Sequence, residues 1–362
     1  MELPTEIGNL SNIRWLQLCN NNLSGEIPPS IQKMEQLQVL DLENNLFAGE
    51  IPTCLFDFNY LLDLSLGENK LVLKNARIAP RCMLMRLSLR SCNLSGQIPI
   101  WISNQTDLAF LDLSNNNLEG TSLNGWLKEI SQLNKSAFWL PNENDLLLHD
   151  LEVFWKKLKR GLPNKNLQLY TFIDLSNNQL SGEIPNSLGG LKDLKSLNLS
   201  QNKLSGRIPS SFGGLQSLES LDLSHNNFFG EIPYTLANLF ELSYLDLSNN
   251  KLKDRMPSGP QMDRMNDPNS YANNSGLCGT QIKVSCEKVP SEPKLKEEKT
   301  KKSNSWEIWF SWEMAVIGYP SGFLSTVLVM YVVGYFNITP QPGRRKRRRS
   351  LVRHGLFGFL CI

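Results

Sequence analysis

Residues 218–226 read Leu-Glu-Ser-Leu-Asp-Leu-Ser-His-Asn, and this stretch fits the template L-x-x-L-x-L-x-x-N. Eight segments of the chain fit the template at a period of about 24 residues, and a ninth begins at Ile13. One such unit cannot bury its apolar face alone, so neighbouring copies must stack and bury it for each other. The spacing therefore predicts a solenoid, and a solenoid favours a binding function.

Each repeat contains a short strand whose side chains alternate between two faces. In the repeat that begins at Ile13, Leu16 and Leu18 are predicted to point inward, and Trp15 and Cys19 outward. An Asn follows the strand, and its amide can satisfy backbone groups buried in the turn. Only Cys92 replaces this Asn, as the template allows. We expect a ladder of stacked amides from Asn21, Asn45, Asn69, Asn116, Asn178, Asn202, Asn226 and Asn250.

A second signature, Leu-x-Gly-x-Ile-Pro, follows the Asn in several repeats, as at residues 23–28, 94–99 and 180–185. Gly permits a backbone bend that other residues resist, and Pro suits an irregular side because it lacks an N–H group. With this signature the repeat resembles the plant-specific leucine-rich repeat, over residues 1 to about 257. The resemblance implies an α/β-type solenoid, a right-handed superhelix with a parallel concave β-sheet.

The repeats are interrupted over residues 121–169, which we interpret as an island with one amphipathic helix or a pair of strands. The order of these segments, with repeats before the island and four repeats after it, resembles the layout of plant leucine-rich-repeat receptor-like proteins. We expect seven regions: residues 1–120, leucine-rich repeats with a partial first copy; 121–169, the island; 170–257, four repeats; 258–286, a C-terminal cap; 287–313, a juxtamembrane linker; 314–336, a transmembrane helix; and 337–362, a short basic cytoplasmic tail.

Residues 271–286 resemble the C-terminal cap of that family, which implies a disulfide between Cys278 and Cys286. Such a short closed loop can seal the open edge of the last repeat. Residues 314–336 carry no charge and are long enough to span a bilayer, and a basic cluster at 344–349 follows them. A nuclear signal is the alternative interpretation of that cluster. We expect a single-pass type I protein of the plasma membrane with extracellular repeats.

Two further sets of residues depend on this topology. Gly318 and Gly322 form a G-x-x-x-G step that allows close helix packing in a membrane, although chance and Pro320 compete with that interpretation. The triplet Asn-x-Ser/Thr is an acceptor for glycans in secreted proteins, and an Asn-rich repeat also generates it by chance. The candidate glycosylation sites before the span are Asn9, Asn22, Asn93, Asn104, Asn134, Asn198 and Asn273.

Composition and motifs favour no catalytic chemistry. The net charge of +2 gives no reason to expect nucleic-acid binding. The Cys and His residues have no metal-ligand spacing, and no kinase, hydrolase or phosphate-loop motif is present. We therefore expect no enzyme, no cofactor and no metal site. We attribute the column Asp112, Asp174, Asp222 and Asp246 to the generic Leu-Asp-Leu-Ser pattern and to solvation of the strand face.

Binding must then depend on strand positions that vary between repeats and point away from the core. Large aromatic residues and Arg are the types that anchor interfaces. On this ground the candidate ligand-binding residues of the concave face are Trp15, Arg86, Arg90, Phe110, Phe172 and Tyr244.

The family resemblance implies a cell-surface receptor without its own kinase. Such a protein binds an extracellular peptide or protein ligand and signals, in defence or development, through a receptor-like kinase co-receptor or adaptor. One alternative is a leucine-rich-repeat inhibitor of wall-degrading enzymes, from which the predicted span distinguishes this chain. Another is a non-functional truncated gene remnant, because the repeats start at residue 1 without a secretory signal or N-terminal cap.

Overall fold

The computed structural model describes residues 1–73, 78–120, 151–155, 158–162 and 171–286. The chain divides into two compact units, Met1–Val289 and Pro290–Ile362, and all described residues belong to the first. The predicted span over 314–336, with Gly318 and Gly322, and the basic tail lie outside the described residues. Every helix in the described part of the chain is too short or too polar to cross a membrane.

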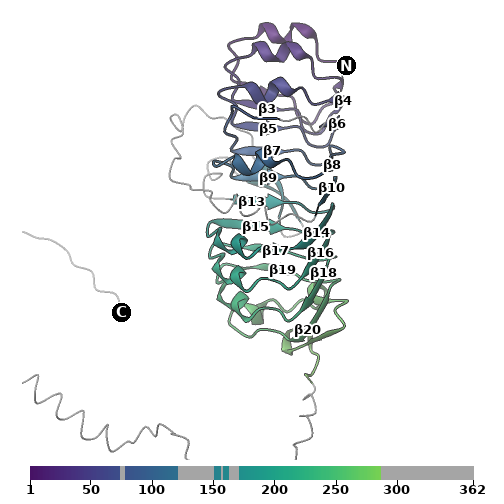
Figure 1. The fold of residues 1–362 in the computed structure, drawn as a ribbon, viewed down its shortest axis with the longest axis vertical. Coiled ribbons are helices and arrows are strands. Elements are labelled where there is room, and N and C mark those ends of the chain that lie inside the picture. The colour runs from purple at the N-terminus through teal and green to yellow at the C-terminus, as the bar shows by residue number, and fades with distance from the viewer. Residues whose placement is uncertain (74–77, 121–150, 156–157, 163–170, 287–362) are drawn as a thin grey trace, which may run out of the picture. The chain divides into compact units, whose positions relative to one another are not determined.

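Nine strands of the described residues, one from each repeat, form a parallel sheet that runs the length of the stack (Figure 1). They are β1 (Trp15–Gln17), β3 (Val39–Asp41), β5 (Asp63–Ser65), β7 (Arg86–Ser88), β9 (Phe110–Asp112), β13 (Thr171–Asp174), β15 (Leu194–Asn198), β17 (Ser220–Asp222) and β19 (Tyr244–Asp246).

The register of this sheet places each central leucine beside the central leucine of the next repeat. Leu40 pairs with Leu64, and Leu197 pairs with Leu221. All four side chains are fully buried, and they belong to one hydrophobic cluster that extends from Leu16 to Leu277. The repeats thus bury each other's apolar faces, which confirms the predicted leucine-rich-repeat solenoid with a parallel sheet.

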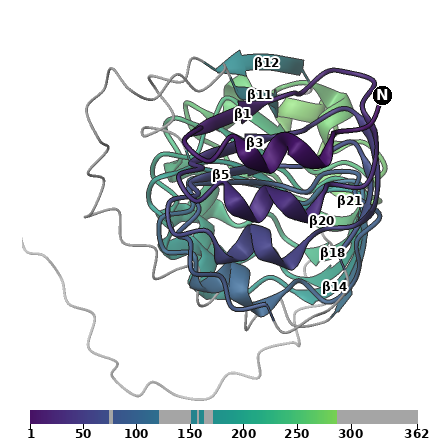
Figure 2. The same ribbon diagram turned by 90° about the horizontal axis from the view of Figure 1, so that it is seen from above.

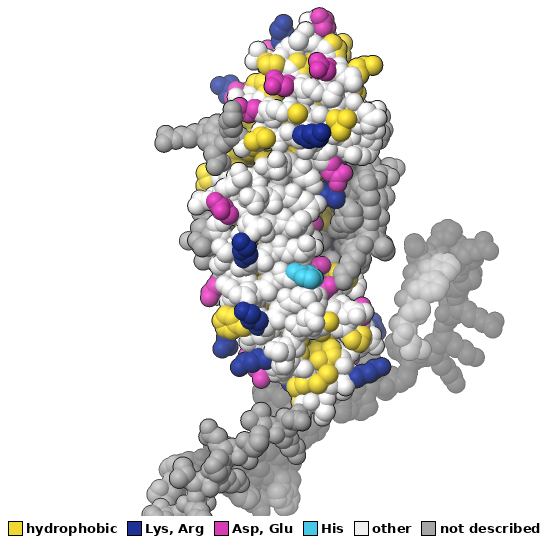
Figure 3. Space-filling view, turned by 90° about the vertical axis from the view of Figure 1, so that its right-hand side faces the viewer, with side chains coloured by type: hydrophobic (Ala, Val, Ile, Leu, Met, Phe, Trp, Pro, Cys, Tyr) yellow, Lys and Arg dark blue, Asp and Glu magenta, His cyan; other side chains and the backbone are white. Residues whose placement is uncertain are grey.

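A second layer of strands follows the turn of each repeat. Its strands are β2 (Ser24–Gly25), β4 (Leu46–Glu50) and β6 (Lys70–Val72) in one sheet, and β8 (Ser95–Gly96), β10 (Asn117–Gly120), β14 (Gln179–Glu183), β16 (Lys203–Gly206), β18 (Asn227–Gly230), β20 (Lys251–Arg255) and β21 (Gly276–Cys278) in another. Gly206 needs its lack of a side chain, because its φ is +87° and a Cβ would lie 2.7 Å from Cγ of Glu183. The side seen in Figure 3 is mostly uncharged, with scattered charged side chains.

Short 3-10 helices complete the repeats, and Figure 2 shows those of the first repeats lying one behind another. Pro209 and its equivalents precede them with φ near −60°. A Cβ on Gly189 would lie 2.1 Å from the carbonyl oxygen of Ser211, so these turns stack at backbone contact. The helices are η1 (Thr5–Asn9), η2 (Pro29–Lys33), η3 (Thr53–Asp57), η4 (Ile100–Asn104), η7 (Asn186–Gly190), η8 (Ser210–Gly214), η9 (Tyr234–Asn238), η10 (Met262–Arg264), η11 (Pro268–Tyr271) and η12 (Thr280–Ile282).

The turn asparagines form the expected ladder of amides. The side chain of Asn226 donates to the carbonyl oxygens of Leu199, Leu223 and Ser224 at 2.9–3.2 Å, and its Oδ1 accepts from the N–H of Leu204 at 3.0 Å. From Asn45 onward, these amides join their own turns to the preceding repeat, whereas Asn21, among the described residues, bonds only within its own turn. These bonds satisfy backbone groups that would otherwise be buried without partners.

The repeats on either side of the island continue the same parallel sheet. Strands β9 and β13 pair directly, with Leu111 beside Ile173, although 62 residues separate them in sequence. Asn178 continues the ladder across this junction by donating to the carbonyl oxygen of Leu113 at 3.0 Å. Within the island, β11 (Leu151–Trp155) and β12 (Leu158–Leu162) form an antiparallel pair.

The C-terminal cap copies part of a repeat. Its strand β21 pairs with β20, and Asn274 donates to the carbonyl oxygen of Leu247 at 2.9 Å, as a turn asparagine would. Tyr271 replaces the leucine of the template and donates its hydroxyl to the carbonyl oxygen of Met265. Cys278 and Cys286 are joined by a disulfide. The cap therefore covers the last leucines with a modified copy of the same structure.

Candidate ligand-binding face

We define the concave face as the face of the nine-stranded sheet that points away from the leucine core. The sheet register aligns its side chains in columns along the stack. The first column is Trp15, Val39, Asp63, Arg86, Phe110, Phe172, Ser196, Ser220 and Tyr244. The second is Gln17, Asp41, Ser65, Ser88, Asp112, Asp174, Asn198, Asp222 and Asp246.

A polar hollow of about 420 Å³ lies on this face over strands β9 to β19. It is formed by the side chains of six successive repeats, from that of β7 to that of β19, and we call it the concave groove. The residues that line it are Arg90, Asp112, Ser114, Asn115, Asp174, Ser176, Ser196, Asn198, Ser200, Gln201, Ser220, Asp222, Ser224, His225, Tyr244, Asp246 and Ser248. Four carboxylates against one arginine make this described part of the face acidic.

The carboxylates of the groove are held in place by the serines two residues later. Ser114 donates to Oδ1 of Asp112 through its N–H at 2.9 Å and through its hydroxyl at 2.6 Å. Ser176 makes the same two bonds to Asp174. The Leu-Asp-Leu-Ser pattern thus places the carboxylates in one column, with Asn198 between Asp174 and Asp222, which creates an ordered array of acceptors.

Asp112 and Asp174 face each other across the junction with the island. Both residues are half-buried, and the loss of hydration raises the pKa of each carboxyl above its ordinary range. The negative charge of Asp112 raises the pKa of Asp174 further, while hydrogen bonds from Ser176 and Asn198 lower it. This pair can therefore hold a proton at mildly acidic pH.

Tyr244 lies between the last two carboxylates of the groove. Its hydroxyl is 3.2 Å from Oδ2 of Asp246 and 3.4 Å from Oδ2 of Asp222. Burial, followed by the charges of both aspartates, raises the pKa of the tyrosine hydroxyl, so it remains a donor. The arrangement places a half-buried aromatic ring beside two carboxylates.

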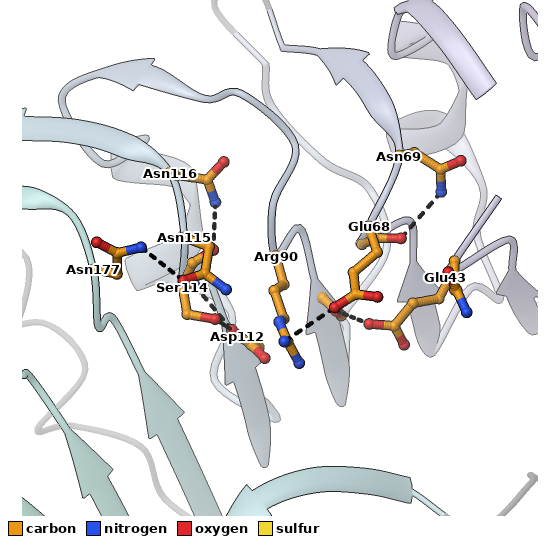
Figure 4. Close-up of polar contacts among 12 residues, drawn as sticks. Glu43, Glu68, Asn69, Arg90, Asp112, Ser114, Asn115, Asn116 and Asn177 are labelled. Atoms are coloured by element: carbon orange, nitrogen blue, oxygen red, sulfur yellow. Dashed lines mark hydrogen bonds and ion pairs between the residues drawn. The ribbon is translucent and has the colours of Figure 1, made fainter. Parts of the chain in front are cut away.

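The other end of the groove carries Arg90, which Figure 4 shows between Glu68 and Asp112. The guanidinium lies 3.0 Å from Oε1 of Glu68. Glu43 accepts a hydrogen bond from the hydroxyl of Ser88 at 3.2 Å, and burial raises its pKa to about 7. Arg90 thus lies among acidic side chains at this end of the groove.

Arg86 on β7 and Asp63 on the neighbouring strand β5 form a buried ion pair. Nη1 of Arg86 lies 3.1 Å from Oδ2 of Asp63, and Ser65 donates to Oδ1 of the same carboxylate at 2.8 Å. Asp63 is 2% exposed and Arg86 is 8% exposed. Burial raises the pKa of Asp63 to about 6 against the opposing effect of Arg86.

Known proteins with this repeat were compared with the chain. The family model described as Leucine rich repeat matches residues 168–228 and 208–252, and a second model of the same description matches 12–34, 36–58, 83–105 and 107–128. Receptor-like protein 46 of Arabidopsis thaliana is 60% identical over 183 residues, which are 51% of this chain and 23% of that protein. Receptor-like protein 50 is 46% identical over 235 residues, 62% of this chain and 26% of that protein.

The chain is a leucine-rich-repeat protein homologous to plant receptor-like proteins. The matched region spans about a quarter of these two relatives. Among solved structures, the ectodomain of the Arabidopsis receptor kinase HAESA, bound to an extended IDA peptide hormone, has a TM-score of 0.60 and 30% identity, covering 79% of this chain and 41% of that one. A plant ice-binding protein has a TM-score of 0.60 and 25% identity, covering 80% of each chain.

The ligand-binding residues predicted from the sequence all lie on the concave face of this leucine-rich-repeat protein, but they differ in exposure. Trp15, Arg90 and Tyr244 are partly exposed. Phe110 and Phe172 are buried side by side, with ring centroids 6.2 Å apart, across the junction with the island. These two rings therefore contribute to the packing of the junction.

The predicted glycosylation sites also differ in their surroundings. Asn9, Asn22, Asn93, Asn104 and Asn273 are exposed, and Asn134 lies outside the described residues. Asn198 is half-buried in the concave groove, where its amide nitrogen donates to Asp174 at 3.0 Å. A glycan on that nitrogen would displace the bond, so the structure removes Asn198 from the sites that we expect to be occupied.

The residues that sequence reasoning missed are the carboxylates of the groove. Their column was attributed to a generic pattern, and no single Leu-Asp-Leu-Ser segment distinguishes a ligand contact from solvation. The signal that could have found them is their common position in the repeat, because stacked repeats must bring Asp112, Asp174, Asp222 and Asp246 onto one face.

Proposed function

We propose that the chain is part of a cell-surface receptor that binds an extracellular peptide along the concave groove. The observation that carries this proposal is the hollow of about 420 Å³, with its ordered carboxylates and the ring of Tyr244. A groove formed from several repeats suits an elongated ligand, because each repeat adds a further set of contacts. A binding role, rather than a catalytic one, agrees with this geometry.

The relatives support the same function. The HAESA ectodomain, which shares the fold, holds a peptide hormone, and another structure contains HAESA with that peptide and the co-receptor SERK1, at a TM-score of 0.54 and 34% identity over 76% of this chain and 44% of that one. We infer by analogy a co-receptor or adaptor kinase as the signalling partner of this protein.

The charge of the groove indicates the chemistry of the ligand. Asp112, Asp174, Asp222 and Asp246 line it together with Arg90. A ligand segment with Lys or Arg side chains complements these carboxylates and gains in association rate at low salt. The ligand that we propose therefore has a basic segment over strands β9 to β19.

Membrane attachment completes the proposal. The apolar segment 314–336 and the basic cluster after it support a single-pass type I topology in the plasma membrane, with the repeats outside. Gly318 and Gly322 would then allow close packing against the span of a partner receptor kinase.

The test is peptide binding to the full-length chain displayed on plant cells. Labelled synthetic peptides of equal length and different net charge are titrated onto cells that display either the parent chain or Asp222→Asn/Asp246→Asn. We expect basic peptides to bind the parent, and the variant to lose about tenfold in affinity, or about 1.4 kcal/mol. The matched control is Asp57→Asn/Asp254→Asn, because both residues are exposed outside the groove. Equal affinity of basic and acidic peptides, or no effect of the groove variant, would contradict the proposal.

A further inference from the structure

One edge of the Arg86 guanidinium has no acceptor. Nη1 is paired with Asp63 at 3.1 Å, but neither Nε nor Nη2 has a hydrogen-bond partner among the described residues. Both nitrogens are buried. Nε and Nη2 lie side by side on the planar group, and this edge is one that binds a carboxylate through two parallel hydrogen bonds.

Two buried guanidinium donors without acceptors lower the stability of the folded protein. Each buried donor without an acceptor destabilises the folded protein by about the free energy of removing that group from water, and by more when the group is charged. Buried polar groups in native proteins are therefore nearly always paired. Two adjacent orphaned donors on one cation point to a missing acceptor with two oxygen atoms.

The position of Arg86 makes a ligand the natural source of that acceptor. Arg86 lies on the concave face, in register with Asp63 on one side and Phe110 on the other, and it is not part of the leucine core. Arg90, which lines the groove, is four residues further along the same segment. The unfilled edge thus lies next to the surface where the ligand is proposed to bind.

We propose that the Nε and Nη2 edge of Arg86 is a subsite for a carboxylate group carried by the ligand. This proposal rests on the proposed function in one respect, that the ligand lies along the concave face. With the acidic groove beyond β9, it gives the ligand a polarity: an acidic group at Arg86 and a basic segment over strands β9 to β19.

Asp63 is the internal anion that competes with this carboxylate. It occupies Nη1, and the charged groups on the strands beside it are Arg86 on β7 and Asp41 on β3. The pKa of Asp63 is raised to about 6, so the carboxylate becomes neutral as the pH falls through that value. Arg86 then loses its compensating charge, and its affinity for an external carboxylate rises.

Entry of the carboxylate requires a side-chain movement, because the Arg86 side chain is only 10% exposed. Arginine has a long flexible stem that permits this movement without a change in the sheet. The expected binding to a small free anion is therefore weak but saturable.

The experiment uses sodium formate, a minimal carboxylate, with the purified full-length chain at constant ionic strength. We expect formate to raise the melting temperature of the chain saturably at pH 5.5. At pH 7.5, the affinity for formate obtained from this rise should be at least tenfold lower. Arg86→Lys keeps the charge but lacks the planar edge, so it should abolish the response. Arg207→Lys, at an exposed arginine outside the concave face, should respond like the parent. An unsaturable parent response, or an unchanged response in Arg86→Lys, overturns the proposal.

A second variant keeps the test decisive if Arg86→Lys does not fold. Asp63→Asn removes the competing anion and leaves Arg86 intact, so it should bind formate about tenfold more tightly at pH 7.5 and lose the pH dependence. Weaker binding, or an unchanged pH dependence, contradicts the subsite. The part of the formate response that Arg86→Lys abolishes reports on Arg86, so a failure of peptide binding in the concave groove leaves this result intact and is distinguishable from it.

Discussion

At the scale of single residues, the turn asparagines from Asn45 onward connect their repeats to the preceding ones. Asn226 makes four hydrogen bonds to backbone groups, and all four groups belong to buried residues. Cys92 takes the same position in one repeat and approaches the carbonyl oxygen of Leu66 with its sulfur at 3.3 Å. A thiol offers one weak donor where the amide offers two and an acceptor.

We expect Asn226→Ala to lower the free energy of unfolding by about 2–3 kcal/mol, because it leaves buried backbone groups unpaired. Cys92→Asn should be neutral or stabilising, because Asn fits the same turn. Denaturant unfolding of the full-length chain measures both effects, with Asn227→Ala at an exposed neighbouring position as the control. A loss in Cys92→Asn as large as that in Asn226→Ala would contradict the ladder argument.

The surroundings of single asparagines also determine which Asn-x-Ser/Thr triplets carry glycans. Asn93 is exposed, whereas Asn198 uses its amide nitrogen in a bond to Asp174. We expect glycopeptide mass spectrometry of the chain secreted in plant cells to find high occupancy at Asn93, low occupancy at Asn198 and none at Asn337, on the predicted inner side. Full occupancy at Asn198 would show that the bond to Asp174 does not protect the site, and modified Asn337 would reverse the proposed topology.

At the scale of elements, the last strand depends on covalent support. Among the described strands, β21 pairs with β20 alone, and its final residue is Cys278. The disulfide to Cys286 closes a loop with a sequence separation of 8. Such a bond restricts the unfolded chain and keeps the edge strand in place.

Cys278→Ser should therefore lower the stability of the chain by about 2–3 kcal/mol on the loop-entropy model. Differential scanning calorimetry of the full-length chain detects this as a lower melting temperature. Cys54→Ser is a suitable control, because Cys54 is an unpaired, partly buried cysteine. If both variants lose the same amount, the disulfide contributes nothing beyond the removal of a sulfur atom.

At the scale of the whole molecule, the concave face links stability to pH. Burial raises the pKa of Glu43 to about 7 and that of Asp63 to about 6, and it also raises the pKa values of Asp112 and Asp174. A carboxyl whose folded pKa is raised stabilises the protein fully below its unfolded value, near 4, and this contribution is lost as the pH rises through the folded value.

We therefore expect the melting temperature to fall as the pH rises from about 4 to about 7, since these four carboxyls must ionise in the folded chain. Glu43→Gln should flatten the upper part of this slope. Glu241→Gln, at an exposed position, should leave the slope unchanged. A melting temperature that rises across this pH window would contradict the prediction.

The sequence by itself determined the repeat, its strands, the amide ladder and the solenoid, because each depends on a local pattern that recurs at a fixed spacing. The pairing of Leu16 with the central leucine of the next repeat and the hydrogen bonds of Asn226 both follow from the pattern of one repeat and its recurrence. The cap was recognised from its resemblance to the C-terminal cap of the family, but its copy of the ladder through Asn274 was not predicted.

Only the tertiary structure decided which outward-pointing side chains remain available to a ligand. Stacking brings Asp112 beside Asp174 across 62 residues, and it buries Phe110 against Phe172. It also pairs Arg86 with Asp63 and leaves one edge of its guanidinium unfilled. Burial and charge pairing depend on neighbours from other repeats, so no pattern within a single repeat could specify them.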